Sequence, residues 1–128
     1  MKTGLSIGAA IGLCLLAVAP AHADAVYDGC AAKAVSNVDY SDCGSAWIMR
    51  EDKRLNAAWK RLYPDLPPQS KKDLLAEQRL WIAYKDKSCL WRANGDWGRE
   101  GQVIAYPTCR AKVIGDRAAY LEMMIADM

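Results

Sequence analysis

Two long stretches with helical spacing, separated by prolines, constrain the fold of this chain most strongly. The first covers residues 42–63, and its stripe repeats at four- and three-residue intervals. The stripe positions are Ile48, Asp52, Leu55, Trp59 and Leu62. This spacing predicts a helix that packs along one face. Proline cannot continue a helix, so the helix should end at Pro64.

The second stretch covers residues 69–93, and Pro67 and Pro68 precede it. Its stripe consists of Leu74 or Leu75, Gln78, Trp81 or Ile82, Lys85 and Cys89. A short connection between two long helices predicts an antiparallel helical hairpin. We expect Ser41 or Asp42 to cap the first helix and Ser70, with Asp73, to cap the second. Asn94 and Gly95 should end the second helix.

The rest of the chain also favours helices, and no stretch alternates clearly enough to predict a strand. Residues 25–35 predict a short helix or turn, and residues 108–126 predict a helix that Thr108 can cap. Between the last two long helices, residues 94–106 contain Gly95, Gly98 and Gly101 and predict a loop. The predicted fold is all-α: a small bundle of three to four helices around the hairpin.

The N-terminal 23 residues have the features of a signal peptide. Lys2 precedes an uncharged apolar run from Gly4 to Val18, and Ala21-His22-Ala23 is a typical cleavage pattern. The run is too short for a spanning helix, which needs about 20 apolar residues. We therefore expect cleavage near Ala23, one domain over residues 24–128, no membrane anchor after cleavage, and a periplasmic or secreted product.

Four cysteines remain after the predicted cleavage, since Cys14 lies within the removed run and does not follow a small residue. They are Cys30, Cys43, Cys89 and Cys109. An even number in a small exported domain predicts two disulfides, and four cysteines allow three pairings. Cys43 and Cys89 lie equally far from the hairpin turn, which slightly favours Cys43–Cys89 with Cys30–Cys109. No CxxC spacing supports a zinc site.

Charge and composition exclude several functions. Of the 17 lysines and arginines only Lys2 lies in the first 23 residues, so the remaining chain has 16 against 15 acidic residues, a net charge of +1. Nucleic-acid binding would need a strongly basic face. The only histidine, His22, leaves with the signal peptide, which removes His-based triads, dyads and metal ligands. We expect neither a metal nor a cofactor.

Polar residues in or beside the apolar stripes form a candidate network. They are Asp52, Asn56, Gln78, Lys85 and Asp86, and Arg79, Lys85 or Arg117 could supply the cation. A buried carboxylate needs a partner, so the main interpretation is a network that fixes the helix register. A ligand or acid–base site is the alternative. Separately, the glycine-rich loop could display Arg92, Trp97 and Arg99 to a partner, or simply connect two helices.

These motifs together resemble a known family. They read Asp52-x-x-Leu55-Asn56-x-x-Trp59-x-x-Leu62, then Leu74-x-x-x-Gln78-x-x-Trp81-Ile82-x-Tyr84-Lys85-Asp86-x-x-Cys89, then Cys109 and Arg117-x-x-x-Leu121. This pattern, over residues 30–122, is similar to the N-terminal domain family of the lysozyme inhibitor LprI. The family usually has tyrosine at Trp59 and arginine at Lys85. The second difference keeps the charge but loses the guanidinium fork.

The resemblance implies an exported helical domain that binds a protein, with lysozyme or another peptidoglycan-cleaving enzyme as the expected target. The alternative is an envelope interaction or immunity module without lysozyme-inhibitory activity. An enzyme is not expected, because it would need a carboxylate pair such as Asp52 and Asp86, and nothing in the sequence places these two together. Arg92, Trp97 and Arg99 remain the candidate partner-binding residues.

Overall fold

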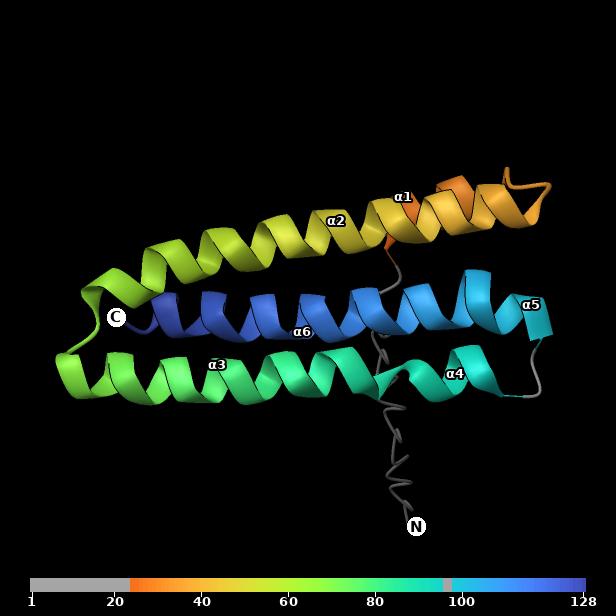
Figure 1. The fold of residues 1–128 in the computed structure, drawn as a ribbon. Helices are drawn as coiled ribbons and strands as arrows, with labels where there is room; N and C mark the ends of the chain where they lie inside the picture. Colours follow the sequence, from red (N-terminus) through yellow and green to blue (C-terminus); the bar gives the residue numbers. More distant parts are fainter. Residues whose placement is uncertain (1–23, 96–97) are drawn as a thin grey trace, which may run out of the picture.

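Three long helices lie side by side in the computed structural model, which describes residues 24–95 and 98–128 (Figure 1). They are α2 (Asn37–Leu62), α3 (Pro68–Ser88) and α6 (Tyr106–Ala126). α2 and α6 run in the same direction, and α3 runs antiparallel to both. The predicted all-α bundle is confirmed, and so is the hairpin that α2 and α3 form about the proline-rich turn. The predicted signal peptide, residues 1–23, and Trp97 lie outside the described residues.

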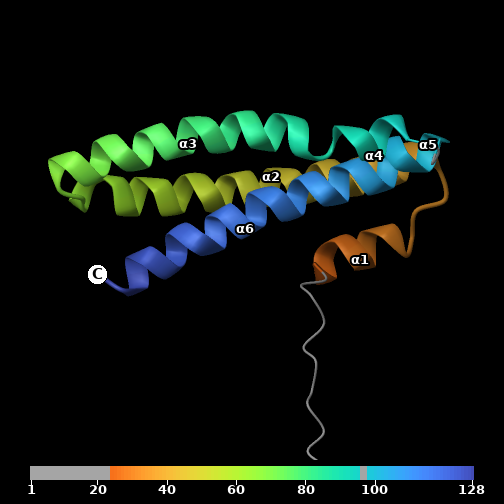
Figure 2. The same cartoon turned by 90° about the horizontal axis from the view of Figure 1, so that it is seen from below.

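Short elements complete the bundle. α1 (Ala25–Ala31) packs against α2 on the side away from α3 (Figure 2). A 3₁₀ turn, η1 (Tyr63–Asp65), follows α2 and contains Pro64. At the opposite end lie α4 (Leu90–Asn94), α5 (Gly98–Glu100) and a π-helical turn, η2 (Gly101–Ala105).

The helix starts differ from those predicted. α2 begins at Asn37 rather than near residue 42, because Ser36 and Asp39 form a capping box. The Ser36 Oγ accepts from the Asp39 amide at 3.2 Å, and the Asp39 carboxylate accepts from the Ser36 amide at 2.9 Å. α3 begins at Pro68 without a side-chain cap, since proline is pre-organised for the first helical position. The predicted caps at Ser41, Asp42 and Ser70 were therefore wrong.

The predicted helix 69–93 is broken, and the predicted loop 94–106 is largely helical. α3 ends at Ser88, Cys89 has φ −103° and ψ −2°, and α4 then continues to Asn94, where the predicted end is confirmed. Residues 98–105 are helical and lead directly into α6. Pro107 has no amide to donate, and the Tyr106 amide instead bonds to the Gly101 carbonyl in a π-type turn.

The core lies mainly between α2 and α6. Its larger cluster contains Leu55 and Leu62 of α2 and Ile114, Ala118 and Leu121 of α6. Leu121 is fully buried. Trp81 and Leu74 of α3 pack only at the margin of this cluster, and α3 has no buried residue. A second cluster joins α1 to the bundle through Tyr27, Cys43, Trp47 and Ala111.

Small residues set the distance between α2 and α6. A Cβ built on Gly44 would lie 2.5 Å from the Cβ of Pro107, much closer than carbon atoms can approach. Ala111 and Ala118 of α6 are completely buried. The two helices therefore touch almost backbone to backbone near Gly44, and a larger residue there would push them apart.

The disulfides join Cys30 to Cys43 and Cys89 to Cys109, with Cα–Cα distances of 5.7 and 5.9 Å. All four predicted cysteines are bridged, but the favoured Cys43–Cys89 pairing is wrong. That prediction used only distance from the hairpin turn. In the structure Cys43 faces α1, which folds back along α2, while Cys89 faces α6.

Replacing Gly44 with alanine should destabilise the protein by about 1–3 kcal/mol, because overpacking at Pro107 outweighs the better helix propensity of alanine. Urea unfolding measures this change. Gly29→Ala is the matched control, since a Cβ on Gly29 meets nothing within 4 Å. The control should leave stability unchanged or increase it. Equal stability of Gly44→Ala and wild type would contradict the close contact.

Digestion of the unreduced protein with trypsin should yield linked peptides containing Cys30 with Cys43 and Cys89 with Cys109. Trypsin can cleave after Lys33, between Cys30 and Cys43, and after Arg92 and Arg99, between Cys89 and Cys109. Replacing both cysteines of either bridge with alanine should lower the free energy of unfolding by roughly 2–4 kcal/mol. A linked peptide containing Cys43 and Cys89 would show that the structure has the wrong pairing.

Candidate functional site

Polar side chains join α3 to α6, where few apolar side chains pack between the two helices. Arg117 of α6 is 7% exposed, and its Nε donates to Gln78 Oε1 at 2.9 Å. Its Nη1 lies 2.5 Å from Glu77 Oε1, and its Cζ lies 5.3 Å from the centre of the Tyr120 ring. The structure therefore brings together two residues of the predicted network, Gln78 and Arg117. These two residues connect α3 to α6, which agrees with the interpretation that the network fixes the register of the helices.

A second link lies nearer the Cys89–Cys109 bridge. Arg110 Nη2 is 3.0 Å from Asp86 Oδ1, and Arg110 Nη1 donates to the Lys85 carbonyl at 3.0 Å. Lys85 Nζ lies 3.8 Å from the same Asp86 oxygen and 5.7 Å from the centre of the Trp81 ring. The hydrogen bond from Arg110 is the main reason that the pKa of Asp86 is lowered. We name these two links the α3–α6 clasp: Glu77, Gln78, Lys85 and Asp86 with Arg110 and Arg117.

Asp52 and Asn56 do not join the clasp. Asp52 is half-buried, and Asn56 is exposed on α2. Within the described residues, Asp52 has no ion pair with Arg79, Lys85 or Arg117, the cations considered from the sequence. The predicted network therefore divides: its α3 and α6 members assemble, and its α2 members lie outside it.

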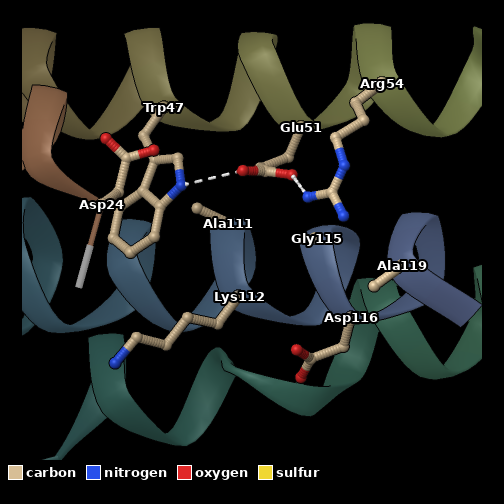
Figure 3. A pocket seen from close by; sticks show the side chains of 9 residues that line it. All are labelled: Asp24, Trp47, Glu51, Arg54, Ala111, Lys112, Gly115, Asp116 and Ala119. Carbon is tan, nitrogen blue, oxygen red and sulfur yellow. Dashed lines mark hydrogen bonds and ion pairs between the residues drawn. The ribbon is translucent and has the colours of Figure 1, made fainter. Parts of the chain in front are cut away.

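A groove of about 270 Å³ follows the contact between α2 and α6 (Figure 3). Glu51 lies between Trp47 and Arg54, accepting from Trp47 Nε1 at 3.3 Å and from Arg54 Nη1 at 2.8 Å. Gly115 makes room for it, since a Cβ there would be 3.0 Å from Glu51 Oε2. The groove therefore has a floor of paired polar groups, and Lys112 and Asp116 also line it.

Two ion pairs extend the groove. Arg54 also holds Glu122 through two parallel bonds of 2.8 Å, a bidentate geometry that fixes orientation. This hydrogen bond is the main reason that the pKa of Glu122 is lowered and that of Arg54 is raised. At the other end, Arg50 Nη2 lies 2.7 Å from Asp24, which also caps α1. These contacts tie α1, α2 and α6 together.

The groove residues were missed by reasoning from the sequence. The signals were present but weak: Trp47, Glu51 and Arg54 follow helical spacing, and Gly115 interrupts a helix, which often marks a close approach. Glu122 could not be matched to Arg54, since that pairing depends on α2 and α6 running in the same direction.

Two of the predicted partner-binding residues, Arg92 and Arg99, lie at the end of the bundle opposite the proline turn, and Trp97 lies outside the described residues. We call this end the tip: residues 89–95 and 98–102 (Figure 1). Arg92 stacks on Trp91, with its Cζ 4.6 Å from the ring centre. Arg99 is exposed, and its Nη1 donates to Gln102 Oε1 at 2.9 Å. Gly98 has φ +55°, a left-handed conformation that favours glycine and lets the chain turn just before Arg99.

The described residues contain neither a metal cluster nor a membrane-spanning helix. Among residues 24–95 and 98–128, no group of three or more His, Cys, Asp or Glu side chains could hold a metal ion. The paired cysteines cannot act as thiolates. In the same part of the chain, no helix is both long and apolar enough to cross a membrane.

The fold and its polar links define a small helical bundle that two disulfides staple. The family model described as "Lysozyme inhibitor LprI" matches residues 30–121, a range that contains both disulfides and the whole clasp. The chain belongs to this family, which is a family of inhibitors and not of enzymes. No curated protein and no solved structure shows significant similarity to the chain.

Breaking the Arg54–Glu122 pair should lower the free energy of unfolding at neutral pH, and this effect should disappear at acid pH. Because the folded pKa of Glu122 is lowered, its contribution is fully present above the ordinary value of 4.5 and is lost as the pH falls through the folded pKa. Glu122→Gln should therefore cost up to about 1 kcal/mol at neutral pH, since both groups are partly solvated. Chemical unfolding over a pH series should show this cost shrinking towards acid.

The exposed Glu100 supplies the control, because Glu100→Gln removes a carboxylate that has no recorded partner in the described structure. Its unfolding curves should follow those of the wild type at every pH. A Glu122→Gln cost that stays constant from neutral to acid pH would contradict the assigned link.

Proposed function

We propose that this protein is a periplasmic or secreted inhibitor of lysozyme or a related peptidoglycan-cleaving enzyme. The observation that carries the proposal is the family match over residues 30–121. The match covers a coherent structural unit, since it includes both disulfides and the residues that fasten α3 to α6. A rigid unit of this kind can present a fixed surface to an enzyme without a large loss of conformational entropy.

The features that predict export support the same proposal. Residues 1–23 carry the signal-peptide pattern, which would leave a domain of residues 24–128. Disulfides persist in oxidising compartments, and this small chain has two. Lysozyme and other wall-cleaving enzymes act in the same compartments, so inhibitor and target would meet outside the cytoplasm.

The tip is the surface that we propose enters the target. Lysozymes cleave sugar chains with two carboxyl groups in a cleft. An exposed guanidinium such as Arg99 could pair with such a carboxylate, and aromatic and arginine side chains dominate the energetics of many protein interfaces. The Cys89–Cys109 bridge fastens the tip to α6, and within the tip Arg99 donates to Gln102. Arg92 and Trp97 are proposed as the neighbouring contact residues.

The net charge of the chain determines how strongly the protein should be attracted to its target at long range. With a net charge of +1 after removal of residues 1–23, the protein gains no long-range attraction to a basic lysozyme. Affinity should then depend on contacts at the tip, and it should change little with salt concentration.

The experiment is an inhibition assay with the oxidised protein recovered after export, tested against animal-type, goose-type and the host's own lytic enzymes. We expect submicromolar inhibition of at least one class. A Trp97→Ala/Arg99→Ala double variant should raise the inhibition constant about 30-fold or more, as loss of an interface hot spot does. Far-UV circular dichroism should confirm that the variant keeps the helical fold.

Two controls separate the tip from the rest of the surface. Lys60→Ala removes an exposed cation from α2, and Asp116→Lys reverses the charge of a residue that lines the groove. Both variants should inhibit as well as the wild type. Loss of inhibition in Asp116→Lys alone would move the contact to the groove. Absence of inhibition by the wild type would contradict the proposal and favour an envelope interaction or immunity module, whose partner a pull-down would then seek.

A further inference from the structure

α3 has two faces with helical spacing, and only one is covered. The covered face contains Leu74, Gln78, Trp81, Lys85 and Ser88, all partly buried towards the rest of the bundle. The helix forms an outer edge of the bundle in both views (Figures 1 and 2). No residue of α3 is fully buried.

The uncovered face also has a regular sequence. Its positions follow three- and four-residue steps through Asp73, Ala76, Leu80, Ala83 and Lys87. Leu80 is 74% exposed, and Tyr84, which adjoins this row, is 59% exposed. This is the spacing of a helix-packing seam, with small alanines on either side of a large leucine. We call these five residues together with Tyr84 the outer seam.

Exposed apolar residues in a row at this spacing indicate a surface that packs against another helix. The charges at the ends of the outer seam indicate which helix would pack against it. Asp73 and Lys87 each lie seven residues from Leu80, on opposite sides, and Ala76 and Tyr84 each lie four residues from it. Apart from Ala83, whose counterpart three residues before Leu80 is Glu77, the seam is therefore complementary to itself when one copy is reversed about Leu80.

We propose that two copies of this chain associate through their outer seams, with the α3 helices antiparallel and a two-fold axis at Leu80. Leu80 then packs on Leu80 of the second copy. Asp73 of each copy faces Lys87 of the other, which forms two equivalent ion pairs, as a two-fold interface requires. Ala76 faces Tyr84, so that a small residue receives a large one. A parallel arrangement would instead place Asp73 against Asp73 and Lys87 against Lys87.

The surroundings of the seam permit this arrangement. Asp73 is exposed, and within residues 24–95 and 98–128 the only side chain recorded as donating to its carboxylate is that of Gln69, at 3.0 and 3.2 Å, so Asp73 can turn to a lysine without losing a buried contact. Lys87 is exposed as well. The outer seam runs from Asp73 to Lys87, which gives it a length of about 21 Å along α3. A single helix pair buries less than a standard interface, so the dimer should form at micromolar concentrations.

Sedimentation velocity of the oxidised, exported protein over a concentration series tests the proposal. The wild type should change from monomer to dimer as the concentration rises. Asp73→Lys and Lys87→Asp should each weaken the dimer about 10-fold or more, since each sets like charges opposite one another. The double variant Asp73→Lys/Lys87→Asp restores opposite charges across the axis and should recover the wild-type dissociation constant.

Two further variants complete the test. Leu80→Glu places two carboxylates on the axis and should leave a monomer at every concentration, with an unchanged circular dichroism spectrum because Leu80 is exposed. Arg79→Asp changes an exposed charge next to Leu80 but off the outer seam, and it should leave the dimer unchanged.

A wild type that stays monomeric throughout the series would overturn the proposal. So would a dimer that survives Leu80→Glu, or a double charge reversal that fails to restore what the single reversals weaken. The Trp97→Ala/Arg99→Ala variant should dimerise normally, so that failure of the inhibitor proposal and failure of the dimer proposal can be distinguished.

Discussion

The close contact between α2 and α6 is the constraint on which the rest of the structure depends. Gly44 meets Pro107 almost directly, and Ala111 and Ala118 are fully buried between the helices. Because dispersion and hydrophobic burial both require close packing, this contact lets Leu55, Leu62, Ile114 and Leu121 form a continuous core. The same approach leaves room for Glu51 over Gly115 and thereby forms the charged groove.

α3 is attached in a different way, and this difference explains its exposure. It contributes Trp81 and Leu74 only to the margin of the core, while the clasp and the Cys89–Cys109 bridge hold it to α6. Polar links and a covalent bond need little buried apolar area. The outer face of α3 is therefore left available for contacts with another molecule, and the tip beyond Cys89 is held at a fixed position on the bundle.

The sequence predicted the helices and part of the clasp, and it failed where distant segments meet. Helical spacing located α2, α3 and α6, and the family motif singled out Gln78 and Arg117, which bond to each other. The motif also singled out Asp52, which stays outside the clasp. Glycines at 95, 98 and 101 suggested a long loop, but residues 98–105 are helical, because packing against neighbouring elements overrides the weak helix propensity of glycine.

The sequence by itself determined the fold class, the proline turn, the four bridged cysteines and the family, since each of these depends on local spacing or residue type. Only the tertiary structure decided the disulfide pairing, the Arg54–Glu122 and Arg110–Asp86 pairs, and which face of α3 stays uncovered. The physical reason is that these contacts join segments far apart in the chain. Their partners are fixed by the direction and distance of packed helices, which local periodicity does not specify.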